Sequence, residues 1–154
     1  MPRGLRTAQI GKCGELLVQY RLLLLGIESS PMSTDSGIDL VAYSPAQQLA
    51  HTIQVKANLK PKPGGGAGSL ALDWWIPEDC PAEWVALVDL SSQGVWLFTL
   101  DEILKHAQQR PKGRAHLYMY TDPSARPRKF DRPAHQWAFE QFRLENRVHA
   151  AFGI

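Results

Sequence analysis

Apolar side chains recur at helical spacing through the first 25 residues of the chain. The stripe consists of Ile10, Cys13, Leu17, Tyr20 and Leu24. Spacings of three and four residues predict an amphipathic helix with this stripe facing a core. Thr7 stands where a helix is capped and Gly26 where one ends, so we expect the helix to run from Thr7 to about Leu25. Its second half is apolar on nearly every side, which predicts deep burial.

Three short segments after this helix favour strands. Residues 28–32 fit a short strand, and the turn 34–37, in which Asp35 has an ordinary turn role, separates it from an apolar strand at 38–43. Residues 51–58 alternate strictly between polar and apolar side chains, which is the period of a strand with one buried face. Three consecutive strands with short connections predict an antiparallel meander.

The rest of the chain predicts a mixture of strands and helices. The Pro- and Gly-rich stretch 60–69 is expected to be a loop, and Thr99 with Glu102 forms a capping box that begins a helix. The other expected elements are strands at 84–90, 95–100 and 116–120 and a C-terminal helix at 134–150. This order of elements predicts one α/β domain over residues 1–154 with a mixed central sheet.

Composition and cysteine content bear on the class of protein and on its cellular location. The 154 residues are 44% hydrophobic and 21% charged, and a chain of this length can bury a core without disulfides or a structural metal. Cys13 and Cys80 lie far apart and form no paired motif, so we expect reduced thiols in a cytoplasmic protein. No apolar run approaches the ~20 residues of a membrane helix, so no membrane partner is expected. The five histidines lack the spacing of zinc ligands.

The formal net charge is only +2, but the positive residues are unevenly distributed. Between residues 105 and 132, eight Lys or Arg stand against two acids, Asp122 and Asp131. Such a cluster can form a local electrostatic footprint for nucleic acid. The predicted phosphate contacts, in this cluster and in the loop 60–69, are Lys60, Lys62, Arg126, Arg128 and Lys129. A solvated charge run and a surface loop without function are the alternative interpretations.

Four polar residues form a candidate site. Asp39 is the one acid in the apolar strand 38–43, where an unpaired carboxylate is costly to desolvate. Gln54 and Lys56 share one face of the next strand, about 7 Å apart. Pairing of the two strands would bring Asp39 to them, and a helix packed across the sheet would add Glu15.

Hard oxygen ligands beside a lysine suit phosphodiester hydrolysis. Mg²⁺ prefers one or two carboxylates, a carbonyl oxygen and several waters. The metal polarises the phosphoryl oxygen and lowers the pKa of a bound water. The lysine can assist deprotonation of that water or stabilise the charge that develops on phosphate.

The order of these residues resembles the PD-(D/E)XK nuclease superfamily. Glu15 on the first helix, Gly37-Ile-Asp39 on a strand and Gln54-Val-Lys56 on the next strand follow the family order of a helical Glu, a strand Asp and a Glu-x-Lys strand. Small Holliday-junction resolvases and restriction-endonuclease-like members are the most similar. The motif resemblance covers about residues 7–60, and Ile38 replaces the family's proline.

The resemblance implies a restriction-endonuclease-like α/β/α sandwich and a DNA endonuclease that depends on Mg²⁺ or Mn²⁺. Asp39 would be the central metal ligand, with Gln54 and the carbonyl of Val55 completing the inner shell. Glu15 would bind a second metal or orient water, and Lys56 would assist the nucleophile. Because a duplex has two strands to cut, a symmetric homodimer is expected.

A second hypothesis follows from Gln54, which stands where the family usually has an acid. A neutral ligand removes one negative charge and weakens metal binding, so the chain could be a catalytically inactive relative that binds DNA or a protein partner. Taken singly, each of the four residues has an ordinary structural explanation as a surface or hydrogen-bonded side chain. Trp74 and Trp75 could stack on bases, although adjacent tryptophans are more typical of a core or an interface.

Overall fold

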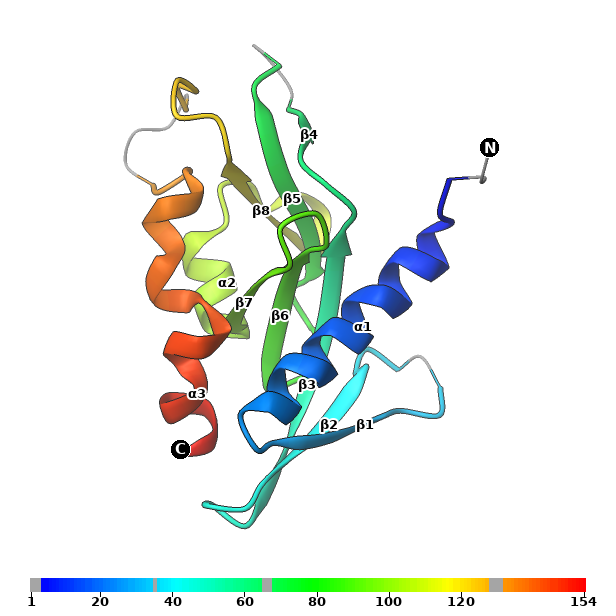
Figure 1. Cartoon of the computed structure of the whole chain (residues 1–154). Helices are drawn as coiled ribbons and strands as arrows, with labels where there is room; N and C mark the ends of the chain where they lie inside the picture. Colours follow the sequence, from blue (N-terminus) through cyan, green and yellow to red (C-terminus); the bar gives the residue numbers. More distant parts are fainter. Residues whose placement is uncertain (1–3, 35, 65–67, 128–131) are drawn as a thin grey trace.

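Residues 4–34, 36–64, 68–127 and 132–154 are described by the computed structural model (Figure 1). The helices are α1 (Thr7–Leu24), α2 (Leu100–His106) and α3 (Leu144–Phe152), with 3₁₀ segments η1 (Pro111–Gly113) and η2 (Gln136–Phe142). The strands are β1 (Glu28–Pro31), β2 (Leu40–Ser44), β3 (Leu49–Asn58), β4 (Lys62–Pro63), β5 (Leu70–Pro77), β6 (Trp84–Asp89), β7 (Gly94–Thr99) and β8 (Arg114–Tyr120).

A five-stranded mixed sheet with the order β1-β2-β3-β6-β7 forms the centre of the molecule. Strands β1, β2 and β3 form the expected antiparallel meander. Strand β6 then pairs in parallel with β3 and antiparallel with β7. Neighbouring residues of β6 point to opposite faces, so that Val85 and Leu87 enter one core and Ala86 and Val88 the other.

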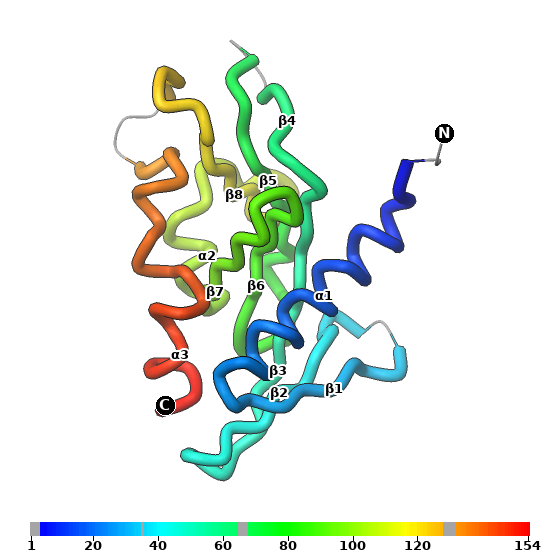
Figure 2. Tube along the Cα trace, in the orientation of Figure 1, coloured from blue at the N-terminus to red at the C-terminus, as the bar shows by residue number. Residues whose placement is uncertain are grey.

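Helices α1 and α3 cover one face of this sheet. In Figures 1 and 2, α1 crosses in front of the sheet and α3 lies at the left, beside β7. Val18 and Leu22 of α1 share that core with Phe152 of α3. The opposite face packs against a three-stranded sheet of order β4-β5-β8, together with α2 and η2. The predicted α/β class, with a central mixed sheet flanked by helices, is therefore confirmed.

The predicted core stripe of α1 was largely wrong, since Leu17 is the one member that packs against a core cluster of the described residues. Gly14, Val18 and Leu22 face the sheet and are buried, whereas Tyr20 and Leu24 of the predicted stripe are 58% and 67% exposed. Gly14 decides the orientation, because a Cβ added there would lie 2.6 Å from the Cβ of Ala57 in β3. The backbone of α1 approaches the sheet closely only where a side chain is missing. None of the described helices combines the length and apolarity needed to cross a bilayer.

Strand β5 and the C-terminal helix differ from the sequence-based expectation, whereas the capping box at Thr99 agrees with it. Strand β5 was not predicted, and it pairs with β8 in the smaller sheet. Its Trp74 is only 3% exposed, which agrees with the expectation that this residue lies in a core or an interface. The single C-terminal helix is interrupted at Arg143, where the backbone is extended between η2 and α3. The capping box is formed as predicted: Thr99 N donates to Glu102 Oε1 (2.8 Å), and Glu102 N donates to Thr99 Oγ1 (3.1 Å).

Candidate functional site

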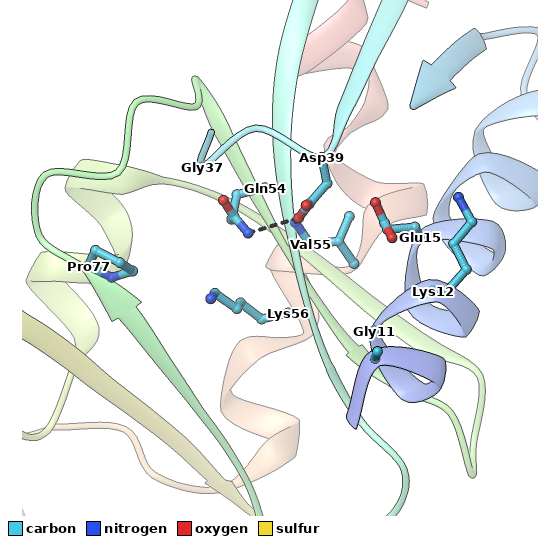
Figure 3. A pocket seen from close by; sticks show the side chains of 10 residues that line it. Gly11, Lys12, Glu15, Gly37, Asp39, Gln54, Val55, Lys56 and Pro77 are labelled. Carbon is cyan, nitrogen blue, oxygen red and sulfur yellow. Dashed lines mark hydrogen bonds between the residues drawn. The ribbon is translucent and has the colours of Figure 1, made fainter. Parts of the chain in front are cut away.

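Strand β3 has different neighbours along its length, which leaves part of one edge open. Residues 49–53 pair with β2, and residues 53–58 pair on the other side with β6. Beyond Ile53, the edge that β2 covered has no paired strand among the described residues. The side chains predicted to form the site gather at this open edge (Figure 3).

Asp39 stands immediately before β2, at the point where the two strands separate. Its backbone N–H donates to Ile53 O (2.9 Å), and its carbonyl accepts from Met32 N (3.0 Å). Its carboxylate oxygen Oδ2 accepts from Val55 N (2.7 Å) and from Gln54 Nε2 (2.8 Å). The carboxylate therefore occupies the position on β3 that a strand carbonyl would otherwise take, and its orientation is fixed.

Gln54 is only 8% exposed and lies beside the loop that precedes Asp39. A Cβ added at Gly37 would lie 3.9 Å from Gln54 Oε1 and 2.9 Å from Pro81 Cδ. With a φ of +86°, Gly37 satisfies both the left-handed backbone and the close packing, so no other residue fits without strain. The amide of Gln54 turns its nitrogen toward Asp39, and its oxygen is directed away from that carboxylate.

Val55 contributes its backbone to the same edge. In an extended strand the N–H and C=O of one residue point to the same side. Since Val55 N donates to Asp39 Oδ2, the carbonyl of Val55 also faces the open edge, while its side chain is buried against α1. Lys56 follows and points with Gln54 toward the opposite side of β3 from Glu15 (Figure 3).

Helix α1 closes the other side of a cavity of about 300 Å³. The cavity is lined by Ala8, Gly11, Lys12, Glu15, Gly37, Asp39, Gln54, Val55, Lys56 and Pro77. All five residues predicted from the sequence to act at the site are thus brought around one cavity. Lys12 was missed, although its place three residues before Glu15 puts both side chains on neighbouring positions of one helix flank.

No protein-family model matches the sequence, and no curated protein matches it significantly. The structure is similar to that of the bacterial homing endonuclease I-Ssp6803I, with a TM-score of 0.61 and 14% sequence identity over 97% of this chain and 99% of that chain. The chain has a restriction-endonuclease-like fold. At this identity the likeness establishes the fold and leaves the chemistry to the residues of this chain.

The oxygen donors at the open edge suit a hard divalent cation such as Mg²⁺. Asp39 and Glu15 offer carboxylates, Val55 offers a carbonyl, and Gln54 offers an amide oxygen after a half-turn of its terminal amide. In the described part of the chain no three His, Cys, Asp or Glu side chains converge on one point. The donor set therefore fits a hard cation held partly by carbonyl oxygens, and does not resemble a zinc centre.

The charges around the cavity balance. Glu15 and Asp39 contribute two negative charges, and Lys12 and Lys56 contribute two positive charges, so their formal sum is zero. A divalent cation added there would raise the local charge to about +2. A phosphate group would then be attracted to the cavity by the cation and by both lysines.

The predicted phosphate contacts are more scattered than the sequence suggested. Lys60 and Lys62 are exposed just beyond β3, Arg126 is exposed in the loop after β8, and Arg128 and Lys129 lie outside the described residues. Other basic residues of the 105–132 cluster have structural partners. Arg110 pairs with Glu78, Arg114 lies 4.6 Å from the ring centroid of Trp75, and Arg132 donates to the carbonyl of Ala107 at the end of α2.

Trp75 already stacks on side chains of β8. His116 stacks on one ring at a centroid distance of 4.0 Å and an interplanar angle of 2°. Arg114 also lies over the Trp75 ring. The indole N–H of Trp74 donates to the carbonyl of Val88 (3.4 Å) inside the core. Both tryptophans of β5 are therefore engaged by side-chain or backbone groups of this chain.

Proposed function

We propose that this protein is a Mg²⁺-dependent DNA endonuclease that hydrolyses phosphodiester bonds at the open edge of β3. The observation that carries the proposal is the gathering of Asp39, Glu15, Gln54, Val55 and Lys56 around one cavity. These groups come from a helix, a strand entry and a central strand, and of the five only Val55 places its side chain in a hydrophobic core. The PD-(D/E)XK fold supports the same class of chemistry.

Asp39 and the carbonyl of Val55 would hold the metal, with Gln54 as a third ligand. When bound, Mg²⁺ or Mn²⁺ supplies polarisation of the phosphate and makes water more acidic. Asp39 is suited to the central role because its carboxylate is already oriented by two hydrogen bonds. Gln54 has to rotate its amide, which exchanges a hydrogen bond to Asp39 for a contact with the cation. Glu15 would orient water or hold a second ion.

Lys56 and Lys12 would act on the phosphate from the two sides of the cavity. Lys56 lies on β3 and Lys12 on α1, so the two ammonium groups approach from different elements. Lys56 would assist the attacking water or stabilise the negative charge that develops on the phosphate oxygens. Lys12 would hold the scissile or adjacent phosphate in place.

DNA would approach along the exposed side of the cavity, with Lys60 and Lys62 contacting its backbone. Both residues are exposed and follow β3, which also carries Lys56. Contacts of this kind weaken as salt concentration rises, since each releases condensed counterions from the DNA. A homodimer would present one cavity to each strand of a duplex.

A cleavage assay tests this proposal. Plasmid, nicked and branched DNA are incubated with Mg²⁺ or Mn²⁺, and with EDTA as the metal-free control. The expected result is metal-dependent cleavage that is lost in Asp39→Ala and kept in Asp79→Ala, which removes an exposed carboxylate that does not line the cavity. Equal cleavage by the parent and by Asp39→Ala would refute the assignment.

The alternative function is a catalytically inactive module that keeps the fold and binds DNA or a protein partner. It is favoured by the hydrogen bond from Gln54 Nε2 to Asp39, which satisfies the carboxylate without a metal. Isothermal titration calorimetry with Mg²⁺ or Mn²⁺ separates the two functions. Saturable binding that disappears in Asp39→Ala supports the nuclease, and no binding at millimolar metal supports the module.

A further inference from the structure

Helix α1 carries an apolar stripe on the side opposite its buried face. The residues of this outer seam are Cys13, Leu16, Tyr20, Leu23 and Leu24. Leu16, Tyr20 and Leu23 are 53%, 58% and 60% exposed, Leu24 is 67% exposed, and Cys13 is also exposed. Single exposed apolar residues are ordinary on a protein surface, but a continuous row on one helix face marks an interaction surface.

The spacing of the outer seam is that of a helix which packs against another helix. From Cys13 to Leu16, Tyr20 and Leu23 the steps are three, four and three residues, the alternation that keeps one seam in contact with a partner helix. The row from Cys13 to Leu23 is about 15 Å long at the rise of an α-helix. The buried stripe of Gly14, Val18 and Leu22 already provides the contact with the sheet, so the fold does not need the outer seam.

The charges near the outer seam argue against DNA or an anionic lipid surface as the occupant. None of its five side chains is charged. Of the charged residues of α1, Lys12 and Glu15 face the cavity, and Arg21 forms an ion pair with Glu145 of α3. A helix that lies on an anionic membrane carries Lys or Arg along its polar face, and α1 has no such row.

We propose that the outer seam of α1 is the interface of a homodimer, in which it packs against the same surface of a second copy. A two-fold contact requires one patch to be complementary to itself, and an uncharged row of Leu and Tyr meets that requirement. Four large side chains more than half exposed on each copy bring the buried area to roughly 1,000 Å² in total, near the lower limit of specific interfaces. The dimer is therefore expected to dissociate at micromolar concentrations.

This interface also connects the two cavities. Lys12 and Glu15 line the cavity from one flank of α1, and Cys13 and Leu16 of the outer seam follow them directly in the sequence. Pairing through α1 would fix the separation and direction of two cavities, one for each strand of a duplex. The proposed surface deepens the dimer part of the proposed function, but it makes no assumption about catalysis.

Light scattering with size-exclusion chromatography tests the interface over about 5–100 µM protein. The parent should show twice the 17.2 kDa chain mass at high concentration. The double variant Leu16→Glu, Leu23→Glu should remain a monomer, because it places charges in the apolar seam. Leu49→Glu is the matched control, since Leu49 is 57% exposed at the start of β3 and lies outside the seam. Circular dichroism of each variant checks that the fold is kept.

The thiol of Cys13 gives a second, local readout. Its alkylation by N-ethylmaleimide should slow as protein concentration rises in the parent and in Leu49→Glu, and should not depend on concentration in the double variant. Cys80 is buried in the core and serves as the internal reference.

Three results would overturn the interface: a monomeric parent at 100 µM, a dimer that survives the double variant, or Cys13 reactivity independent of concentration. Binding of the parent to phosphatidylcholine–phosphatidylserine vesicles that the double variant abolishes would assign the seam to a lipid surface instead. None of these measurements needs DNA cleavage. A dimer that does not cut DNA would refute the nuclease alone, and a monomer that cuts would refute the interface alone.

Discussion

Asp39 and Asp89 are carboxylates at the ends of strands in the same sheet, but their hydrogen-bond partners come from different parts of the chain. Asp89 ends β6 and is 2% exposed. Its Oδ1 accepts from the N–H and hydroxyl of Ser91, and its Oδ2 accepts from the hydroxyl of Ser92. Every one of these partners lies two or three residues away. The carboxylate of Asp89 therefore stabilises a tight turn between β6 and β7.

Asp39 has partners that only the tertiary fold can bring to it. Gln54 and Val55 lie 15 and 16 residues away in the sequence. Helix α1 adds Glu15 and Lys12 to the same cavity. Polar groups from distant segments around an open volume cost folding free energy, and proteins keep such arrangements mainly at functional sites. The contrast separates a carboxylate that stabilises a local turn from one that distant segments hold beside a cavity.

Paired substitutions that keep the shape of each side chain test this contrast most strongly. Asp39→Asn removes the charge of the proposed central metal ligand, so cleavage should fall by about 10³-fold or more. Asp89→Asn removes a charge of the same kind from the turn and should leave cleavage within a few-fold of the parent. Single-turnover rates on plasmid DNA measure both. Similar losses in the two variants would show that Asp39 has no special role.

The two lysines of the cavity should differ in their effects. Lys56→Met should lower the single-turnover rate by about 10²-fold, because it removes a charge proposed to act in the transition state. Lys12→Met should weaken DNA binding more than it lowers the rate at saturating protein. Rates and binding by fluorescence anisotropy are compared, with Lys105→Met on α2 as an exposed control outside the cavity. A Lys56→Met variant as fast as the control would contradict the proposed role.

The free energy of unfolding should depend more on Asp89 than on Asp39, the reverse of their expected effects on cleavage. Asp89→Ala removes the buried acceptor that holds Ser91 and Ser92 in the turn, so the free energy of unfolding should fall by about 1–3 kcal/mol. Asp39→Ala should cost less, because water can enter the cavity and replace the lost acceptor. Urea unfolding followed by tryptophan fluorescence measures both changes. A larger loss for Asp39→Ala would indicate that Asp39 mainly stabilises the fold.

Gln54 offers a test of the cavity itself. Gln54→Glu restores a carboxylate beside Asp39, so Mg²⁺ affinity should rise by about tenfold through the added charge. The metal-free variant should be slightly less stable than the parent, because two carboxylates would lie close together. Calorimetry gives the affinity, and Thr52→Glu on the same strand is the control for an added charge. No gain over that control would place the metal elsewhere.

The sequence identified the helix and strands that carry the candidate site, but it did not identify every residue and strand around them. Alternation identified the strand with Gln54 and Lys56, and order along the chain identified Asp39 and Glu15. The resemblance to PD-(D/E)XK nucleases was confirmed at the level of the fold. Lys12 was missed because a single lysine on a helix gives no signal until the position of the helix on the sheet is known. Strand β5 was missed because it directly follows a Pro- and Gly-rich stretch and because Asp73 interrupts its apolar pattern.

The sequence by itself determined local features: the capping box at Thr99, the three-strand meander, and the polar residues that stand where apolar ones would be expected. Each depends on neighbours a few residues apart, so it can be recognised in a short window. The tertiary structure decided which face of α1 is buried and where the cavity opens. Gly14 lets α1 approach Ala57, and this one contact turns Tyr20 and Leu24 outward and Glu15 toward Asp39. Gly14 and Ala57 are 43 positions apart in the sequence, so their contact leaves no pattern in a local window. It forms only when α1 packs on the assembled sheet.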